Sequence, residues 1–210
     1  MSARRVVLWR HGRTASNAQN RFQGQLDVPL DEVGRAQAAE AAAHLAAWTT
    51  DVGAVVASDL SRAVDTARAF TALTGHDVVQ DPALREVDAG TWQGLVGEEI
   101  AQRWPDEHAA WRRGEDVRMG GGETRTELGL RVATAVERHA STVEDTLLVA
   151  SHGAALKAAV VRLVGLPVTA AGALAGFRNC HWAVLVRRGD AWVLEEYNAG
   201  AAGAGVGAEG

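Results

Sequence analysis

The chain has 210 residues, of which 47% are hydrophobic, and it carries a formal net charge of −5. This apolar content is enough for one substantial core, so two full domains are not expected. The acidic balance and the lack of a basic tail argue against nucleic acid and membrane surfaces as partners. The first apolar stretch, at 6–9, is too short for a signal-peptide core or a membrane span. Because Cys180 is the only cysteine, a reducing, cytoplasmic location is expected.

Strand and helix patterns alternate along the chain in the order expected of a parallel sheet. The strands are expected at 6–9, 54–57, 78–80, 147–150, 182–187 and 191–196. The helices are expected at about 31–48, 60–73, 98–113, 123–140 and 154–163. Asp31 and Asp59 are candidate N-caps, and a polar loop is predicted at 13–27. The last two strands flank an Arg-Gly-Asp turn and predict a hairpin.

This order predicts an α/β fold, a three-layer sandwich whose central sheet is mostly parallel and has helices on both faces. We expect one domain over 1–198, with an insertion at about 95–122 that lies over the site. The segment 199–210 consists mostly of Ala and Gly and is expected to be disordered.

Basic side chains follow three of the apolar runs. Arg10 and His11 follow the first run, Arg62 lies just beyond the second, and His152 follows the third. Ligands of open α/β sheets bind beyond the carboxyl ends of parallel strands, so these groups are expected to share one site. Two imidazoles and two guanidiniums at one edge form an electropositive pocket for a compact anion, and phosphate fits best.

The tripeptide Arg10-His11-Gly12 resembles the hallmark of the histidine phosphatase superfamily, also called the phosphoglycerate mutase-like family. Further matching stretches follow in the same order: Arg13-Thr14 with Asn17, 22–30 leading to Gly34, 58–63 with Thr66-Ala67, 84–86 leading to 90–94, 121–124, and 151–153. The resemblance covers nearly the whole chain and implies a phosphoglycerate mutase-like fold.

The resemblance implies that His11 is the nucleophile and carries the phosphoryl group as a phosphohistidine. This role requires a neutral imidazole, which neighbouring cations favour. Arg10, Arg62 and His152 are then expected to surround the equatorial oxygens and stabilise the transferring group.

The resemblance also makes Glu86 the proton donor to the leaving alkoxide and then the base that activates water. Asp88 is a nearby rival for this role. The expected substrate-binding residues are Asn17, Gln23, Gly24 and Arg113. No closely spaced pattern of metal ligands is present, so neither a metal nor another cofactor is expected.

Two activities within the family compete. Mutases of the family are typically longer after the acid, so the short segment here favours hydrolysis of a small-molecule phosphomonoester. However, Trp111-Arg112-Arg113 resembles the segment with which phosphoglycerate mutases grip a carboxylate, so a mutase is the alternative. A solvated helix face with a packed Trp would explain the same residues. The segments 23–27 and 192–199 look like the glucosyl-3-phosphoglycerate phosphatase branch, whose substrate also carries a glycerate.

Two other classes of protein remain as alternatives, a phosphoprotein phosphatase and a non-catalytic module that binds phosphorylated ligands. The presence of both His11 and Glu86 argues against the module. The Trp-bearing insertion favours a small molecule over a phosphoprotein. A homodimer is left open.

Overall fold

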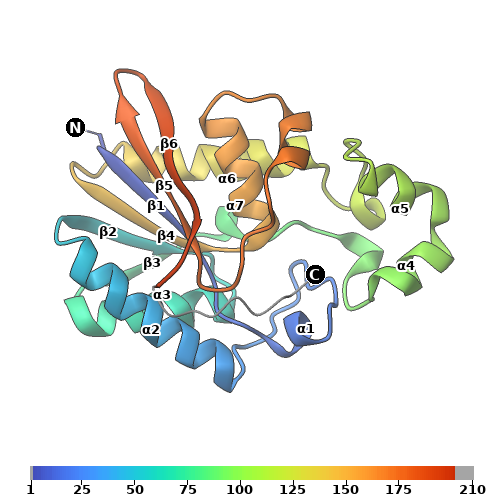
Figure 1. Cartoon of the computed structure of the whole chain (residues 1–210), viewed down its shortest axis with the longest axis horizontal. Helices are drawn as coiled ribbons and strands as arrows, with labels where there is room; N and C mark the ends of the chain where they lie inside the picture. The colour runs from blue at the N-terminus through green and yellow to red at the C-terminus, as the bar shows by residue number, and fades with distance from the viewer. Residues whose placement is uncertain (1, 202–210) are drawn as a thin grey trace.

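A six-stranded mixed sheet forms the centre of the computed structural model, which describes residues 2–201 (Figure 1). The strands are β1 (Arg5–Arg10), β2 (Val52–Ala57), β3 (Val78–Gln80), β4 (Thr146–Ser151), β5 (Trp182–Arg188) and β6 (Ala191–Ala199). Their spatial order is β3-β2-β4-β1-β5-β6. The first four strands are parallel, whereas β5 and β6 form the predicted antiparallel hairpin.

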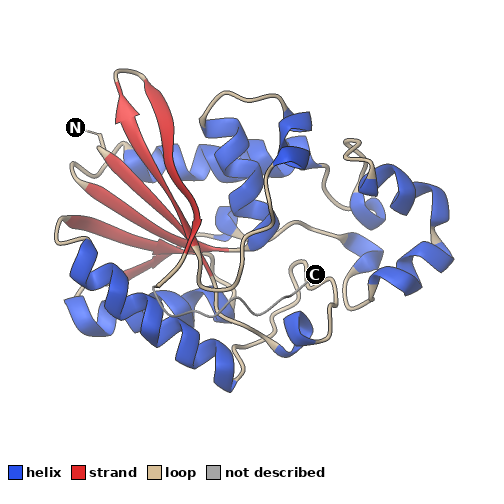
Figure 2. Ribbon diagram, in the orientation of Figure 1, coloured by secondary structure: helices blue, strands red, loops and turns tan. Residues whose placement is uncertain are grey.

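Helices cover both faces of the sheet, so the predicted three-layer α/β fold is confirmed (Figure 2). The helices are α1 (Ala15–Ala18), α2 (Glu32–Trp48), α3 (Ser61–Thr74), α4 (Gly97–Arg103), α5 (Pro105–Arg112), α6 (Arg125–Ala140) and α7 (Gly153–Leu163). Short 3-10 helices lie at η1 (Pro82–Leu84), η2 (Gly90–Trp92), η3 (Met119–Gly121) and η4 (Val168–Ala173).

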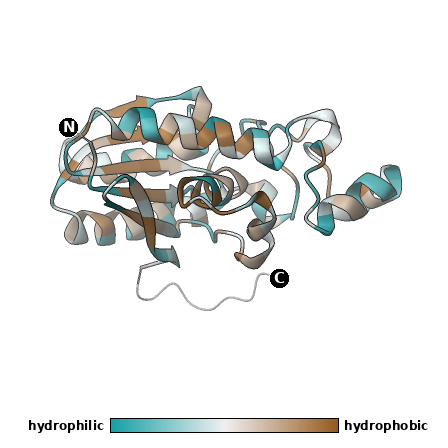
Figure 3. Cartoon of the chain, turned by 90° about the horizontal axis from the view of Figure 1, so that it is seen from above, coloured by the Kyte–Doolittle hydropathy of each residue, from teal (hydrophilic) through white to brown (hydrophobic). Residues whose placement is uncertain are grey.

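The side chains of β1 alternate between two cores. Val6 and Leu8 belong to the core beneath α6 and α7, whereas Val7 and Trp9 belong to the core beneath α2 and α3. This is the two-residue period of a strand, and all four side chains are fully buried because both faces are covered. In Figure 3 the central strands are mostly hydrophobic, while hydrophilic and hydrophobic residues alternate along the outer helices.

The strand register brings the chemical groups together. Arg10 pairs with Ser151 across β1 and β4, so the residues that follow them, His11 and His152, emerge side by side at one edge of the sheet. Their ring centroids are 5.1 Å apart. The expectation that separate strands deliver these imidazoles to one place is therefore confirmed for this pair.

Several local expectations differ from the structure. Asp31 does cap α2, accepting from the Gly34 N–H at 2.7 Å, but the expected cap of α3 by Asp59 is wrong. The Asp59 carboxylate is instead held by the Arg85 guanidinium in a bidentate pair, with N–O distances of 2.6 and 2.7 Å. Leu60 occupies the cap position without a side-chain hydrogen bond.

The remaining differences concern where the helices and strands begin and end. The helix expected at 98–113 is divided at Trp104-Pro105, because proline lacks the N–H that a continuous helix needs. The loop expected at 13–27 contains the short helix α1, and the helix expected from 123 begins at 125. The tail expected from 199 starts too early, since Ala199 ends β6; residues 202–210 lie outside the described residues.

A close backbone approach fixes the loop that follows His11. A Cβ atom on Gly34 would lie 2.0 Å from the main-chain oxygen of Arg13, and one on Gly12 would lie 2.3 Å from the oxygen of Gly34. Both contacts are with backbone atoms and cannot be relieved by turning a side chain. The first turn of α2 therefore packs directly on the end of β1, and only glycine allows it.

We predict that Gly34→Ala lowers the free energy of unfolding by about 1–3 kcal/mol, the usual cost of overpacking. Urea denaturation measures this change. Gly172→Ala is the matched control, because a Cβ atom there meets nothing within 4 Å. Equal stability of the two variants would show that the contact between α2 and the loop is not tight.

Candidate active site

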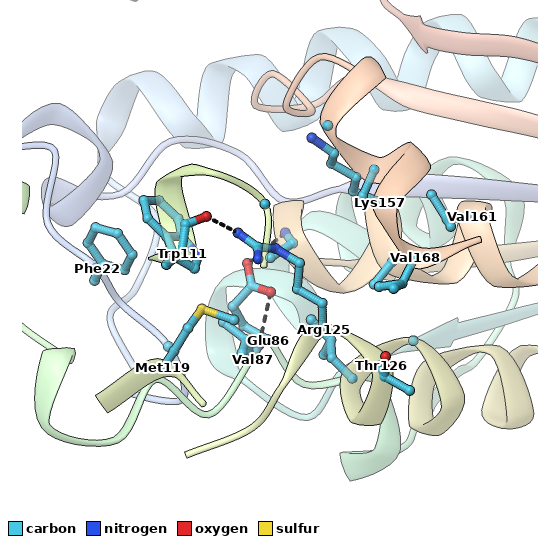
Figure 4. Close-up of a pocket in the computed structure, with 18 of the residues that line it drawn as sticks. Phe22, Glu86, Val87, Trp111, Met119, Arg125, Thr126, Lys157, Val161 and Val168 are labelled. Atoms are coloured by element: carbon cyan, nitrogen blue, oxygen red, sulfur yellow. Dashed lines mark hydrogen bonds between the residues drawn. The ribbon is translucent and has the colours of Figure 1, made fainter. Parts of the chain in front are cut away.

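A cavity of about 1040 Å³ is lined by residues that follow the carboxyl ends of the parallel strands and by residues of α5, α6, α7 and η4. Its lining includes Arg10, His11, Arg62 and Glu86. Figure 4 shows the part of the cavity between Phe22 and Val168. Four of the five predicted catalytic residues therefore face one space, and His152 lies directly beside His11.

The His11 ring is held with one nitrogen available for attack. Its Nδ1 lies 2.7 Å from the main-chain oxygen of Gly12. Because a carbonyl can only accept, Nδ1 carries the proton and Nε2 keeps its lone pair in the neutral ring. Burial, followed by the charges of Arg62 and Arg10, holds the pKa of His11 well below its usual range. His11 is therefore a neutral imidazole at neutral pH, the form that a nucleophile requires.

Arg62 is a fully buried guanidinium in the first turn of α3. It donates to the main-chain oxygens of Leu26 at 2.7 Å and Gly24 at 2.9 Å, and its Nε donates to Nδ1 of His152 at 3.2 Å. Burial lowers the pKa of Arg62 to about 10, so the group remains charged at neutral pH. Its position is thus fixed by three acceptors before any ligand binds.

The same contacts determine the tautomer of His152. Because the Nε of Arg62 can only donate, Nδ1 of His152 accepts and Nε2 carries the proton. Nε2 then donates to the Ser58 hydroxyl at 2.8 Å. Burial, then the charge of Arg62, holds the pKa of His152 well below its usual range. A role for Ser58 was missed by the sequence analysis, although it lies in the matching stretch 58–63.

The Glu86 carboxylate is anchored at the start of α7. It accepts from the backbone N–H groups of Val87 at 3.0 Å, Ala155 at 2.8 Å and Ala154 at 3.1 Å. A helix N-terminus favours negative charge, so α7 presents this carboxylate to the cavity. Asp88, the rival acid, accepts from the Gly90 N–H and is not among the described residues that line the cavity.

Arg131 on α6 braces the segment that carries Glu86. It forms a bidentate pair with Glu123, with N–O distances of 2.6 and 2.7 Å. The same guanidinium donates to three main-chain oxygens, those of Ala83 and Arg85 at 3.0 Å and Glu86 at 3.3 Å. The sequence offered only the motif at 121–124 as a signal for this clamp, because Arg131 lies far from Glu86 along the chain.

Three of the four predicted substrate-binding residues line the cavity. They are Asn17, Gln23 and Gly24. Arg113 is not among the described lining residues; it is exposed and pairs with Glu115 at 2.7 Å. Its neighbour Arg112 lines the cavity instead.

An aromatic cluster attaches the insertion to the rest of the protein. Trp111 of α5 packs edge-on against Phe22 and Trp92, with ring centroids 5.4 and 6.0 Å apart, and stacks with His108 at 5.7 Å. Trp92 is fully buried. Phe22 and Trp111 also line the cavity, so they form its aromatic wall (Figure 4).

Comparisons with known proteins identify the family. Residues 6–200 match the sequence model of the histidine phosphatase superfamily (branch 1). The chain belongs to this superfamily. It is 36% identical to the glucosyl-3-phosphoglycerate phosphatase of Mycolicibacterium vanbaalenii, over 96% of this chain and 97% of that protein. It is 38% identical to the protein of the same name from Mycobacterium tuberculosis, over 88% and 86% of the two chains.

Comparison with solved structures agrees with this family assignment. A mycobacterial glucosyl-3-phosphoglycerate phosphatase in complex with VO3 matches with a TM-score of 0.84 at 35% identity, over 94% of this chain and all of that one. The resemblance that the motifs indicated is confirmed, and so is the prediction of a phosphatase, which these relatives favour over a phosphoglycerate mutase. Within residues 2–201, no helix is long and apolar enough to cross a membrane.

The two neutral histidines predict a dependence of stability on pH. The pKa values of His11 and His152 are lowered in the folded protein, so the unfolded chain binds more protons below about pH 6.5. The stability that these groups contribute is present above that pH and is lost as the pH falls. Urea unfolding between pH 7 and pH 5 should show that His11→Gln weakens this dependence by about 1.4 kcal/mol per pH unit. An unchanged slope would mean that His11 is not held neutral.

Proposed function

We propose that the protein hydrolyses a small-molecule phosphomonoester in two steps through a phosphohistidine at His11. The observation that carries this proposal is the free Nε2 lone pair of a buried, neutral His11, flanked by Arg10 and Arg62 in the cavity that also holds Glu86.

In the first step, Nε2 of His11 attacks phosphorus in line with the ester oxygen. The N–P bond forms as the P–O ester bond breaks, and Glu86 in its acid form gives its proton to the leaving alkoxide. Arg10 and Arg62 offer guanidinium N–H groups to the phosphoryl oxygens, whose charge they stabilise. The alcohol product leaves, and the phosphoryl group stays on His11.

In the second step, Glu86 acts as a carboxylate. It takes a proton from a water molecule, whose oxygen attacks phosphorus as the N–P bond breaks. Inorganic phosphate leaves, His11 regains its lone pair and Glu86 regains its proton. The backbone N–H groups of Ala154 and Ala155 hold the carboxylate at one place through both steps. No step needs a metal ion.

The substrate that the cavity supports best is glucosyl-3-phosphoglycerate or a related phosphoglycerate or sugar phosphate. The cavity is at the upper end of the range for small-molecule sites, so it accommodates more than a phosphoryl group and a short alcohol. The aromatic wall of Phe22 and Trp111 offers an apolar surface beside the phosphoryl site. The similarity to glucosyl-3-phosphoglycerate phosphatases points to the same substrate class.

The dependence of the rate on the leaving group tests whether Glu86 donates the proton in the first step. We predict that Glu86→Gln lowers kcat/KM, which reports the first step, by about 10²- to 10⁴-fold for an alkyl phosphate such as glycerol 3-phosphate. The kcat/KM for p-nitrophenyl phosphate, whose leaving group needs little protonation, should fall far less. Asp88→Asn is the matched control. Equal losses on both substrates would contradict proton donation by Glu86.

Trapping of the ³²P-labelled enzyme tests the phosphohistidine intermediate in the same preparations. With a ³²P-labelled substrate and an alkaline quench, the parent should retain acid-labile label and His11→Ala should retain none. His44→Ala, which changes a histidine stacked on Trp182, is the control and should label like the parent. Phosphate release by His11→Ala at a rate near that of the parent would overturn the mechanism.

A further inference from the structure

The cavity holds more positive charge than one phosphoryl group needs. Seven cationic side chains and a single carboxylate, that of Glu86, are among the described residues that line it. Arg10 and Arg62 serve the phosphoryl group in the proposed function. Two others, Arg125 at the start of α6 and Lys157 in α7, also line the cavity (Figure 4).

Neither of these two side chains is paired with a carboxylate within residues 2–201. Arg125 donates to the main-chain oxygens of Trp111, at 2.8 Å, and Glu115. Lys157 donates to the main-chain oxygen of Leu174 at 2.6 Å. An arginine has five N–H groups and a lysine has three, so both retain donors beyond these carbonyl contacts. These main-chain contacts hold both cations in place but carry no negative charge of their own; Asp116 offsets part of the charge of Arg125 from a distance, without an ion pair among the described residues.

Both groups are half-buried, and they lie near enough to affect one another. Burial lowers the pKa of Arg125, and burial followed by the charge of Arg125 lowers the pKa of Lys157. Holding two cations together in a partly desolvated wall is unfavourable unless an anion binds between or beside them. The arrangement therefore favours a bound anion at this part of the cavity.

Lys157 lies on the helix whose first turn anchors Glu86. The N–H of Ala154 binds the Glu86 carboxylate, and Lys157 lies three residues further along α7. This is nearly one helical turn, a rise of about 4.5 Å. The helix that anchors Glu86 therefore also carries Lys157, and both residues line the same cavity.

We propose that Arg125 and Lys157 form a second anion subsite and that the enzyme selects phosphomonoesters that carry another anionic group, a carboxylate or a second phosphate, near the ester. This inference rests on the proposed function and adds the residues that choose the substrate. It moves that role away from Arg113, which is exposed and paired with Glu115. The apolar residues beyond Lys157, among them Val161 and Val168, then face the uncharged remainder of the substrate.

A matched pair of ligands tests the subsite. 3-Phosphoglycerate and glycerol 3-phosphate differ by a carboxylate in place of a hydroxymethyl group, and each is measured as a competitor of p-nitrophenyl phosphate hydrolysis. The parent should bind 3-phosphoglycerate about tenfold or more tightly than glycerol 3-phosphate, as expected for hydrogen bonds to a charged group. Glycerol 1,3-bisphosphate, in a third arm, shows whether a second phosphate replaces the carboxylate.

The variants assign the preference to residues. Lys157→Met should remove most of the preference while the KM for p-nitrophenyl phosphate changes less than twofold, and Lys157→Arg should keep it. Arg125→Lys retains a positive charge in the subsite but loses the planar guanidinium with its paired N–H donors. It should therefore weaken the preference for 3-phosphoglycerate in part. Arg162→Gln, another cation of the cavity wall, is the control and should behave as the parent.

The outcomes separate this proposal from the function on which it rests. A parent that does not hydrolyse p-nitrophenyl phosphate would contradict the proposed function. A parent that hydrolyses it but binds the two ligands equally, or a Lys157→Met variant that keeps the full preference, would overturn the subsite alone.

Discussion

Burial of the Arg62 guanidinium at the carboxyl end of the sheet sets the positions of the groups around it. A buried cation is costly unless its donors are satisfied, and here the acceptors are two main-chain oxygens and the ring of His152. The loop that contains Gly24 and Leu26 must therefore fold over the strand ends. Gly24 meets this demand with a φ of +53°, a conformation that suits glycine.

The same charge acts on both imidazoles. Burial, followed by the charge of Arg62, lowers the pKa values of His11 and His152, while the Gly12 oxygen directs the proton of His11 to Nδ1. A neutral imidazole with a lone pair beside permanent cations suits the attack on an anionic electrophile that we propose. A phosphoryl group has this character, and its charge offsets the cost of gathering the guanidiniums.

Much of this arrangement could be predicted because it depends on local patterns. The buried runs of β1 and β4 follow from continuous apolar sequence, and the positions of His11 and His152 follow from the rule that parallel strands end at one edge. Asp31 caps α2 as expected because its partner lies within the same turn. The proposed roles of Glu86 and Arg62 come from the family motifs, because composition alone does not give them.

The remaining features depend on contacts between distant segments. Asp59 has the sequence context of a cap, but Arg85 competes for its carboxylate. Arg131, on another helix, donates to the main chain at Arg85 and Glu86. No short-range sequence pattern predicts this contact. Arg113 fits the Trp-Arg-Arg pattern, yet the way α5 packs through Trp111 decides which arginine faces the cavity.

The substitution Arg62→Lys tests the central role of the buried guanidinium most directly, because it keeps the charge and removes the planar fork. Arg68→Lys, on the exposed side of the same helix, is the matched control. With near-ultraviolet circular dichroism showing a folded variant, kcat/KM for p-nitrophenyl phosphate should fall by about two to three decades in Arg62→Lys and stay unchanged in the control. A folded Arg62→Lys enzyme with activity within threefold of the parent would contradict the account.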